Sequence, residues 1–335
     1  MRILLSCSNT NSPSFIFYKD SLKKLKNESK NIKFTAKKYE TKVLEEDFDI
    51  VLFMSGTKNS NFVKKKNVLY GLIDPRAGNY DNFDKYDFII ANGIEEKFFF
   101  SFAKLPTLIY PVYPSIKLKK KKFNKNKTII SYHGNREHLI NMYPSIFNAI
   151  KKIASKHLIE LLLIYDFKNK GKVSFFNQKE HRFKIYHKQY HDKCFEKYLY
   201  DTDIGIVPQL IPFQTKKIKK NFSYYFSKQL FKKNYFFSLN FKETTNLGRH
   251  FVFAQLKIPT ISDYTLSSSN FINNRINGFL AHDTVDWYEC FEYLINNKKK
   301  SQKIGSKFYL DWKKKYSHSI LNKKFLKFLK NLNDK

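Results

Sequence analysis

The sequence has little of several features that mark common protein classes. Its three cysteines, Cys7, Cys194 and Cys290, lie far apart without CxxC spacing, which argues against a disulfide framework and against a cysteine-based zinc site. It contains no run of eighteen apolar residues, so the pattern predicts no membrane-spanning helix. No secretory signal pattern opens the chain, and we therefore expect a cytoplasmic protein.

Glycine is also scarce, with 10 residues in 335. The loop after the first predicted strand, CSNTNSPS, has no glycine and so lacks the G-x-G-x-x-G signature of nicotinamide-binding Rossmann enzymes. A Walker loop is absent too, which argues against the common kinase and ATPase classes. Asp201-Thr202-Asp203 matches the DxD pattern of metal-binding motifs. However, it precedes the apolar run IGIV and is interpreted as the start of a strand. We expect no cofactor and no metal.

The strongest bias in composition is a net charge of +33. Basic surfaces neutralise phosphates, so a nucleic-acid-binding protein is one alternative function. However, only six of the 62 basic residues are arginine, and phosphate clamps and base readers favour the planar guanidinium over lysine. We expect no specific nucleic-acid partner. The same charge predicts attraction to an anionic membrane surface, and hence peripheral attachment at the inner face of the membrane.

Apolar runs of strand length alternate with helical or loop segments in both halves of the chain, which is typical of parallel α/β sheets. The predicted strands are 2–7, 32–39, 49–55, 67–74, 86–92, 107–111, 128–132, 158–165, 183–187, 203–207 and 259–263. The predicted helices are 15–25, 139–155, 192–200, 251–256, 286–296 and 303–331. A basic, aromatic segment, 211–237, is interpreted as a surface insertion, with an acceptor or membrane contact as the alternative.

The length of 335 residues predicts two domains. A lysine-rich, low-complexity segment divides the two runs of strands and is interpreted as a linker over 118–127. We therefore expect a Rossmann-like domain over 1–117, a second one over 128–305, and a C-terminal helical segment over 306–335. The predicted fold class is α/β, with the two domains facing each other across a cleft.

One segment, 242–263, carries the strongest functional signal: KETTNLGRHFVFAQLKIPTISD. A polar loop leads into a short apolar helix and then a buried strand. The first turn of a helix has unpaired N–H groups and the positive end of the helix dipole, so it favours an anion. Lys242 and Arg249 lie close to this turn in the sequence and add full positive charges. The predicted phosphate-binding residues are Lys242, Thr244, Thr245, Asn246, Gly248 and Arg249. The alternative is an ordinary αβ connection in which Arg249 pairs with a surface carboxylate.

The same segment resembles the donor-binding segment of GT-B glycosyltransferases, close to the large retaining family 4 (glycosyl transferases group 1) with its E-x7-E and Gly-x-Pro-Val-Ile signatures. The matching residues in 242–263 include Asn246, Gly248, Arg249, Phe251, Gln255, Ile258-Pro259-Thr260-Ile261 and Asp263, followed by Asn277-Gly278-Phe279-Leu280 and Trp287. The resemblance is best from residue 128 onward. Two departures mark a divergent branch: the two glutamates fall on Thr244 and Val252, and the turn glycine is Lys257.

The resemblance implies a GT-B fold whose last helix crosses back to the first domain, with the nucleotide sugar held by loops of the second. The loop after the strand 128–132 supplies Gly134, Asn135 and Arg136, of which Arg136 is expected to reach a diphosphate; an ordinary turn is the alternative. Asp74 follows a first-domain strand and is the candidate catalytic base, or else a simple Asp-Pro turn. His133, His138, His187 and His191 lack zinc-like spacing and are interpreted as surface or loop histidines.

The expected function is that of a retaining, hexosyltransferase-like glycosyltransferase. It would move a sugar from a nucleotide-sugar donor to a glycan or lipid-linked acceptor, as in surface polysaccharide biosynthesis. Cations alone can balance the charge of a leaving nucleoside diphosphate, so no metal is needed. Because Val252 replaces the second glutamate, a non-catalytic descendant of the fold is the alternative within this class.

Overall fold

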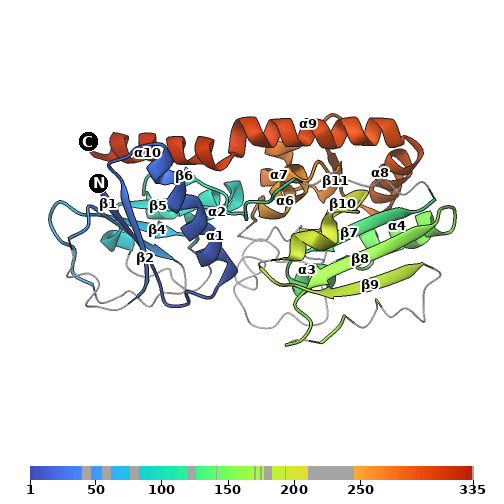
Figure 1. The fold of residues 1–335 in the computed structure, drawn as a ribbon, viewed down its shortest axis with the longest axis horizontal. Coiled ribbons are helices and arrows are strands. Elements are labelled where there is room, and N and C mark those ends of the chain that lie inside the picture. The colour runs from blue at the N-terminus through green and yellow to red at the C-terminus, as the bar shows by residue number, and fades with distance from the viewer. Residues whose placement is uncertain are drawn as a thin grey trace, which may run out of the picture.

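The computed structural model describes residues 1–39, 47–54, 62–75, 83–118, 126–140, 142–169, 171–173, 176, 183–192, 194–209 and 245–333. These residues form two α/β domains that lie side by side (Figure 1), each built on a parallel six-stranded sheet. The predicted fold class is confirmed. The segment 211–237 lies outside the described residues.

The sheet of the first domain has the order β2-β1-β3-β4-β5-β6. Its strands are β1 (Arg2–Cys7), β2 (Lys33–Lys38), β3 (Ile50–Met54), β4 (Leu69–Ile73), β5 (Phe88–Ala91) and β6 (Thr107–Ile109). Helical segments follow the strands: α1 (Pro13–Leu22), η1 (Lys23–Asn27), η3 (Phe83–Lys85), α2 (Ile94–Phe99) and η4 (Phe100–Ala103). The central β3 is buried along its whole length, whereas the lysine-rich β2 lies at the edge, where charged residues discourage pairing with other chains.

The sheet of the second domain has the order β12-β11-β10-β7-β8-β9. Its strands are β7 (Thr128–His133), β8 (Ile159–Tyr165), β9 (Lys184–Gln189), β10 (Ile204–Val207), β11 (Thr260–Asp263) and β12 (Phe279–Ala281). Its helices are α3 (Arg136–Ile140), α4 (Ser145–Ala154), η7 (Phe195–Leu199), α6 (Gly248–Gln255), α7 (Leu266–Phe271), α8 (Thr284–Asn296) and α9 (Lys298–Tyr316), whereas the last helix, α10 (His318–Asn333), packs against the first domain. Every predicted strand is confirmed, and β12 was not predicted.

The helix predictions needed several corrections. The sequence did not predict α2 and α7, and the helix expected over 15–25 is α1 followed by the 3-10 turn η1. The helix expected over 139–155 is split into α3 and α4 at Pro144, which lacks the N–H that a continuous helix needs. The helix expected over 303–331 is split at Ser317, whose backbone is extended with ψ 153°. The segment 192–200 forms only the 3-10 turn η7. Finally, α6 begins at Gly248 rather than at residue 251.

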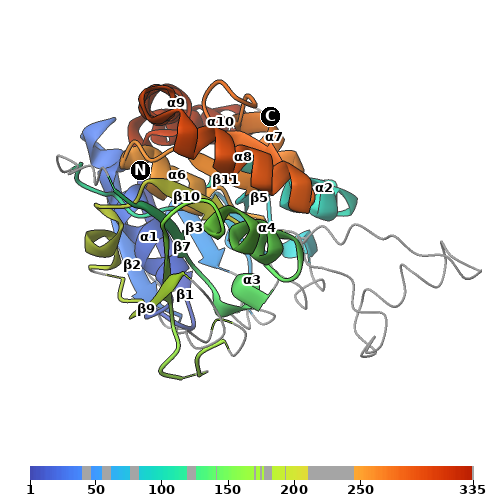
Figure 2. The same cartoon turned by 90° about the vertical axis from the view of Figure 1, so that its right-hand side faces the viewer.

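The chain returns to the first domain at its end, where α9 continues into α10 along one side of the molecule (Figure 1), the side on which α8 also lies (Figure 2). A buried polar cluster joins α10 to α1 and the segment after β6. The Tyr110 hydroxyl donates to Asn322 Oδ1 (2.7 Å), and Asn322 Nδ2 donates to the Ser21 carbonyl (3.2 Å). Such contacts tie the two domains together beyond the linker. Within the described residues, no helix combines the length and apolar character needed to cross a bilayer.

Candidate functional site

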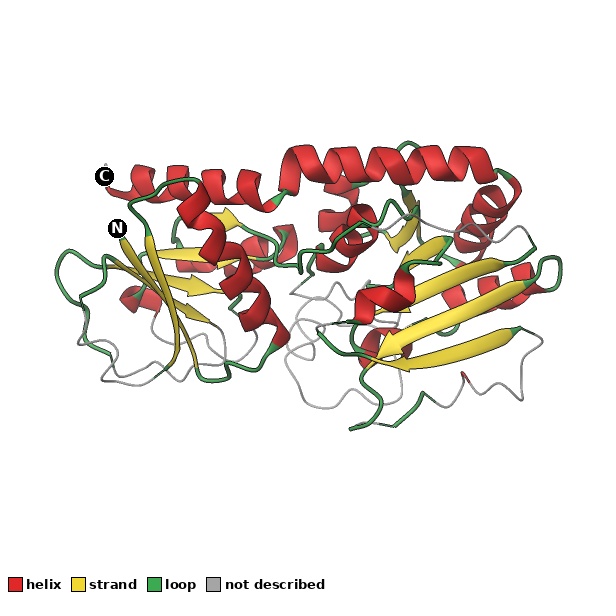
Figure 3. Cartoon of the chain, in the orientation of Figure 1, coloured by secondary structure: helices red, strands yellow, loops and turns green. Residues whose placement is uncertain are grey.

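A cavity of about 370 Å³ lies between the two domains. It is lined from the first domain by the segments after β1 and β6, and from the second by those after β7, β8 and β9. The strands of the two sheets run towards each other in Figure 3, so their carboxyl ends meet at this cleft. Parallel α/β sheets bind ligands at that edge, and the volume falls within the ~300–1,000 Å³ typical of ligand sites.

The loop before α6 is anchored to the first domain. The Gly248 N–H donates to Asn246 Oδ1 (2.7 Å), and Asn246 Nδ2 donates to the Val112 carbonyl (3.2 Å). A Cβ on Gly248 would stand 2.6 Å from that same carbonyl oxygen, so no larger residue fits there. Asn246 and Gly248 therefore hold the domains together at the cavity wall, and the Gly248 N–H is already used.

Arg249 is a half-buried cation at the cavity wall. Its Nη1 is shielded from solvent and has no hydrogen-bond partner among the described residues. No ion pair joins Arg249 to a carboxylate within that part of the chain, which argues against the surface-pair interpretation. Burial lowers the pKa of Arg249, and the nearby Tyr132 and Asp263 oppose this shift. A buried donor on a cation without a partner is costly unless an anion completes the site.

Gly134 allows the close approach of Arg249 to Tyr132. Its φ of +139° lies in a region that residues with side chains rarely adopt, and a Cβ there would stand 2.9 Å from both Arg249 Cδ and the Tyr132 hydroxyl. The guanidinium carbon of Arg249 lies 5.8 Å from the centre of the Tyr132 ring, and the Tyr132 hydroxyl donates to the Asn135 carbonyl (2.5 Å). The Arg249 side chain is thus packed between the loop after β7 and α6.

His133 corrects an expectation. It was interpreted as a surface or loop histidine, but it is the last residue of β7, is buried, and lines the cavity. Burial first, and the charge of Arg249 second, lower the pKa of His133 to about 3, so the ring is neutral at physiological pH. His138 is buried as well, whereas His191 is exposed as expected. The strand β7 extends one residue beyond the predicted strand 128–132 and so includes His133.

The structure brings six of the predicted donor-site residues to this one cavity: Gly134, Asn135, Arg136, Asn246, Gly248 and Arg249. Arg136 is partly engaged, because its Nε donates to the Gly171 carbonyl (3.1 Å). Thr245 is buried away from the lining, and its carbonyl oxygen would stand 2.5 Å from a Cβ on Gly93. Lys242 and Thr244 lie outside the described residues.

Asp74 stands apart from these residues. It follows β4, is buried, and has a left-handed backbone with φ 49°, while its N–H donates to the Ile90 carbonyl (2.9 Å). It is not among the described residues that line the cavity, and part of the loop after it, 76–82, is not described. Its role as a base remains a prediction.

The Asp201-Thr202-Asp203 motif has a structural role, as expected. Asp203 Oδ2 accepts the Ile129 N–H (2.9 Å), and the hydroxyls of Thr202 and Ser131 lie 2.7 Å apart. The motif therefore fastens the start of β10 to β7. Among the described residues, no group of three His, Cys, Asp or Glu side chains is arranged to hold a metal ion.

Sequence reasoning missed much of the cavity wall. The missed residues are mostly apolar or aromatic: Pro13, Ser14, Phe17, Val112, Tyr113, Pro114, Asp166, Tyr190, Phe195 and Val252. They come from five separate segments that meet only in the folded chain. The one available signal was position, because Val112, Tyr113, Pro114 and Asp166 directly follow predicted strands of a parallel sheet.

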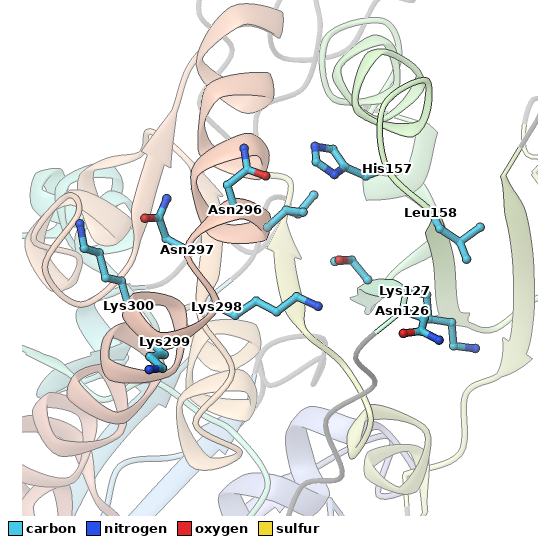
Figure 4. A pocket seen from close by; sticks show the side chains of 11 residues that line it. Asn126, Lys127, His157, Leu158, Asn296, Asn297, Lys298, Lys299 and Lys300 are labelled. Atoms are coloured by element: carbon cyan, nitrogen blue, oxygen red, sulfur yellow. The ribbon is translucent and has the colours of Figure 1, made fainter.

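A different cavity, of about 700 Å³, lies at the opposite edge of the second domain, by the start of β7 and the start of α9. Figure 4 shows Lys127, His157 and Lys298 around it. Lys127 pairs with Glu160 (2.7 Å). This cavity is lined by the amino end of a strand and not by carboxyl ends, so we do not assign the predicted donor site to it.

No protein-family model and no curated protein matches the sequence. Solved structures do match the fold over nearly the whole chain. Sucrose-phosphate synthase from Thermosynechococcus elongatus has a TM-score of 0.65 at 9% identity, with 100% of both chains covered. HepE from Anabaena, solved with UDP and glucose, has a TM-score of 0.62 at 9% identity, covering 99% of this chain and 100% of that one. The lipopolysaccharide outer core galactosyltransferase WaaB has a TM-score of 0.56 at 11% identity, with 99% of each chain covered.

These likenesses, together with the two parallel sheets that face each other across a cleft, show that the chain has the GT-B fold. At such low identity they show the fold alone. Function has to be argued from the site.

Proposed function

We propose that this GT-B protein is a glycosyltransferase that moves a sugar from a nucleotide-sugar donor to a glycan or lipid-linked acceptor. The observation that carries the proposal is Arg249, a half-buried cation at the wall of the interdomain cavity whose enclosed Nη1 has no hydrogen-bond partner among the described residues. Arg136 lines the same cavity. Two guanidinium groups around a small cleft match a diphosphate, because the planar fork of arginine can donate two parallel hydrogen bonds to phosphate oxygens.

In the proposed reaction, the bond between the anomeric carbon and the diphosphate oxygen breaks, and a bond from the acceptor hydroxyl oxygen to that carbon forms. The hydroxyl proton passes to a base. Asp74 is our candidate, although it is not among the described residues that line either interdomain cavity. Negative charge builds on the leaving diphosphate, and Arg249 is held in position by Tyr132 and Gly134 before the reaction starts. A charge fixed in this way stabilises the transition state without reorganisation. We propose that these cations act without a metal.

The first turn of α6 adds a second source of positive potential. The N–H groups of Arg249 and His250 make no hydrogen bond to the part of the chain that the structure describes, whereas the Gly248 N–H is taken by Asn246. Unpaired first-turn N–H groups, together with the helix dipole, favour an anion. The neutral state of His133 is consistent with this arrangement, since a positive charge on this buried ring beside Arg249 would be strongly disfavoured.

The finer features of the reaction are proposed on the likeness to known structures. HepE was solved with UDP and glucose, and WaaB is a galactosyltransferase of the lipopolysaccharide outer core. We propose a hexosyltransferase that works in surface polysaccharide biosynthesis and retains the anomeric configuration, which requires the acceptor hydroxyl to attack on the same face of the sugar from which the diphosphate leaves. Product analysis by NMR with a UDP-hexose donor would reveal the anomeric configuration.

The decisive binding experiment is a thermal-shift titration with UDP and with GDP. A ligand that binds only the folded state raises stability by mass action, by about 2.7 kcal/mol at a hundredfold excess over Kd. We expect a saturable rise for at least one nucleotide. Arg249→Ala should shift this rise to much higher nucleotide concentrations, and Arg2→Ala should not, because Arg2 is an exposed residue remote from the cavity. Single-stranded DNA at physiological salt should act weakly and without defined stoichiometry. Tight, salt-resistant DNA binding without any nucleotide response would favour the nucleic-acid alternative.

Peripheral membrane attachment is a separate part of the proposal. The charge of +33 supports it, as do the exposed lysines Lys298, Lys299 and Lys300 and then Lys313, Lys314 and Lys315 on α9. Each basic residue near an anionic surface contributes about 1 kcal/mol. Cosedimentation with phosphatidylglycerol vesicles should be strong and lost at high salt, while phosphatidylcholine vesicles should not bind.

A further inference from the structure

A second cavity, of about 910 Å³, adjoins the candidate donor cavity. Six lining residues belong to both: Pro13, Phe17, Pro114, Asp166, Tyr190 and Phe195. The two cavities are therefore neighbouring parts of one interdomain cleft. A group bound in the second would lie beside whatever occupies the first.

The second cavity has the opposite charge to the rest of the molecule. Four carboxylates line it, Asp20, Asp166, Asp192 and Glu196, and the described lining residues include no lysine and no arginine. One basic group lies at its margin, because Lys24 Nζ donates to Ser115 Oγ beside Asp20 (2.5 Å). The whole chain has 62 basic residues against 29 acidic ones. A surface patch drawn at random from this composition would be basic, so the acidic lining is specific to this part of the cleft.

The other lining groups suit a sugar. Phe17, Tyr190 and Phe195 give the cavity an aromatic wall, and the rings of Tyr190 and Phe195 stack with centroids 4.8 Å apart. Amide side chains of Asn11, Asn169 and Gln189 stand among the carboxylates. Flat apolar faces next to carboxylates and amides match a sugar ring, which has C–H faces and a rim of hydroxyl groups.

Asp192 points independently to a ligand. Its Oδ1 is shielded from solvent and has no hydrogen-bond partner among the described residues, although Asp192 lines the cavity. Asp166, by contrast, is held by Gln189 Nε2 (2.8 Å) and Asn169 Nδ2 (2.9 Å), and these bonds lower the pKa of its carboxyl group. The carboxylate of Asp166 is thus fixed and charged at the junction of the two cavities. The carboxylate of Asp192 interacts with the Tyr190 hydroxyl, but its Oδ1 has no donor among the described residues, and a bound hydroxyl or ammonium group would supply one.

We propose that this second cavity is the acceptor subsite and that it selects an acceptor sugar without negative charge, with an amine-bearing sugar favoured over a neutral one and an acidic sugar disfavoured. The inference rests on the proposed function, since it places the acceptor beside the nucleotide-sugar donor. Charge separates the two substrates: the phosphates of the donor are drawn to the arginines of the first cavity, and the carboxylates of the second repel them.

Three disaccharides with the same β-1,4 skeleton provide the test: the glucosamine disaccharide with free amines, neutral cellobiose, and cellobiouronic acid. Binding of each is measured by ligand-observed NMR in low salt with saturating UDP. We expect the amine-bearing disaccharide to bind at least about tenfold more tightly than the acid, with cellobiose between them. The preference should shrink as salt screens the charges. Equal affinities, or a preference for the acid, would overturn the proposal.

Variants separate a direct role of the carboxylates from a general effect of charge. Asp192→Asn and Glu196→Gln keep the shape of each side chain and remove its charge, and each should reduce the preference for the amine over the acid. Glu289→Gln removes one charge from an exposed position on α8 outside the cavity and should leave the preference unchanged. If Glu289→Gln has the same effect as the other two, the selectivity belongs to the overall charge and the subsite is wrong.

The binding of UDP keeps this inference distinguishable from the proposed function. Wild-type protein and all three variants are titrated with UDP alone, and we expect the same affinity in each. Failure of UDP and GDP to bind the wild type would contradict the proposed function. Normal UDP binding together with no discrimination among the three disaccharides would contradict the acceptor subsite alone.

Discussion

Replacing Arg249 by alanine should weaken nucleoside diphosphate binding without a matching loss of stability. A hydrogen bond to a charged group contributes about 1.5–3 kcal/mol, and a guanidinium that donates two to a diphosphate contributes about 3 kcal/mol at the low end. The expected effect is a rise of roughly a hundredfold in the Kd for UDP. Arg249→Lys should recover part of the affinity, because a point charge cannot form two parallel hydrogen bonds.

The stability of the unliganded Arg249→Ala protein follows from two opposing effects. Losing the contact with the Tyr132 ring, whose centre lies 5.8 Å from the guanidinium carbon, removes about 0.5–1 kcal/mol. Removing a half-buried cation with an unpartnered Nη1 relieves a desolvation cost that is at least as large. We therefore expect the free energy of unfolding to stay within about 1 kcal/mol of wild type, or to rise.

Isothermal titration calorimetry with UDP and chemical denaturation without ligand measure the two quantities separately. Arg2→Ala, which removes an equal charge from an exposed site, is the matched control and should change neither. Unchanged UDP affinity in Arg249→Ala would refute the diphosphate site. A loss of more than about 2 kcal/mol of stability without ligand would show instead that Arg249 is a structural residue.

Three further predictions concern other parts of the molecule. Gly134→Ala should destabilise the fold and weaken UDP binding, because the new Cβ would stand 2.9 Å from Arg249 Cδ at a φ of +139°; denaturation and calorimetry measure both effects. Asp74→Asn should keep the melting temperature, since asparagine tolerates the φ of 49°, but should lower kcat if Asp74 is the base; unchanged kcat would remove it from the mechanism. Burial lowers the pKa of His133 and His250 to about 3, so below about pH 6.5 the unfolded chain binds protons that the folded protein does not. The free energy of unfolding should therefore fall by up to about 1.4 kcal/mol per pH unit for each histidine as the pH is lowered. Thermal denaturation between pH 7 and 5 measures this, and the melting temperature of His250→Gln should depend less steeply on pH than that of the wild type. An equally steep dependence in the variant would contradict the prediction.

The strands and the division into two sheets could be predicted from the sequence, because the signal for each is local. Strands buried on both faces, such as β3 and β8, appear as unbroken apolar runs. The lysine-rich segment before residue 128 separates two series of such runs. The segment 242–263 could be recognised for the same reason, since loop, helix and strand follow one another within about twenty residues.

Helix boundaries were harder to predict, because the helical spacing of apolar residues continues through points where the backbone leaves the helical conformation. Pro144 and Ser317 interrupt two helices whose apolar residues keep the helical spacing on both sides. The proline was visible in the sequence and carried a physical reason to end the helix. The serine carried no such signal, since serine occurs both inside helices and at their ends.

The sequence by itself determined which residues could bind a phosphate, because residue type and a position after a strand limit the choice. It selected Gly134, Arg136 and Arg249 as candidates, and the structure places these three residues at one cavity; that they bind a phosphate stays a prediction. Tertiary structure alone decided that Arg249 is half-buried without a carboxylate partner among the described residues, that His133 is neutral beside it, and that Asp74 stands apart. It also decided that four carboxylates from distant segments form an acidic cavity in a basic protein. Desolvation and charge pairing depend on neighbours that are remote in the chain, and no local pattern contains them.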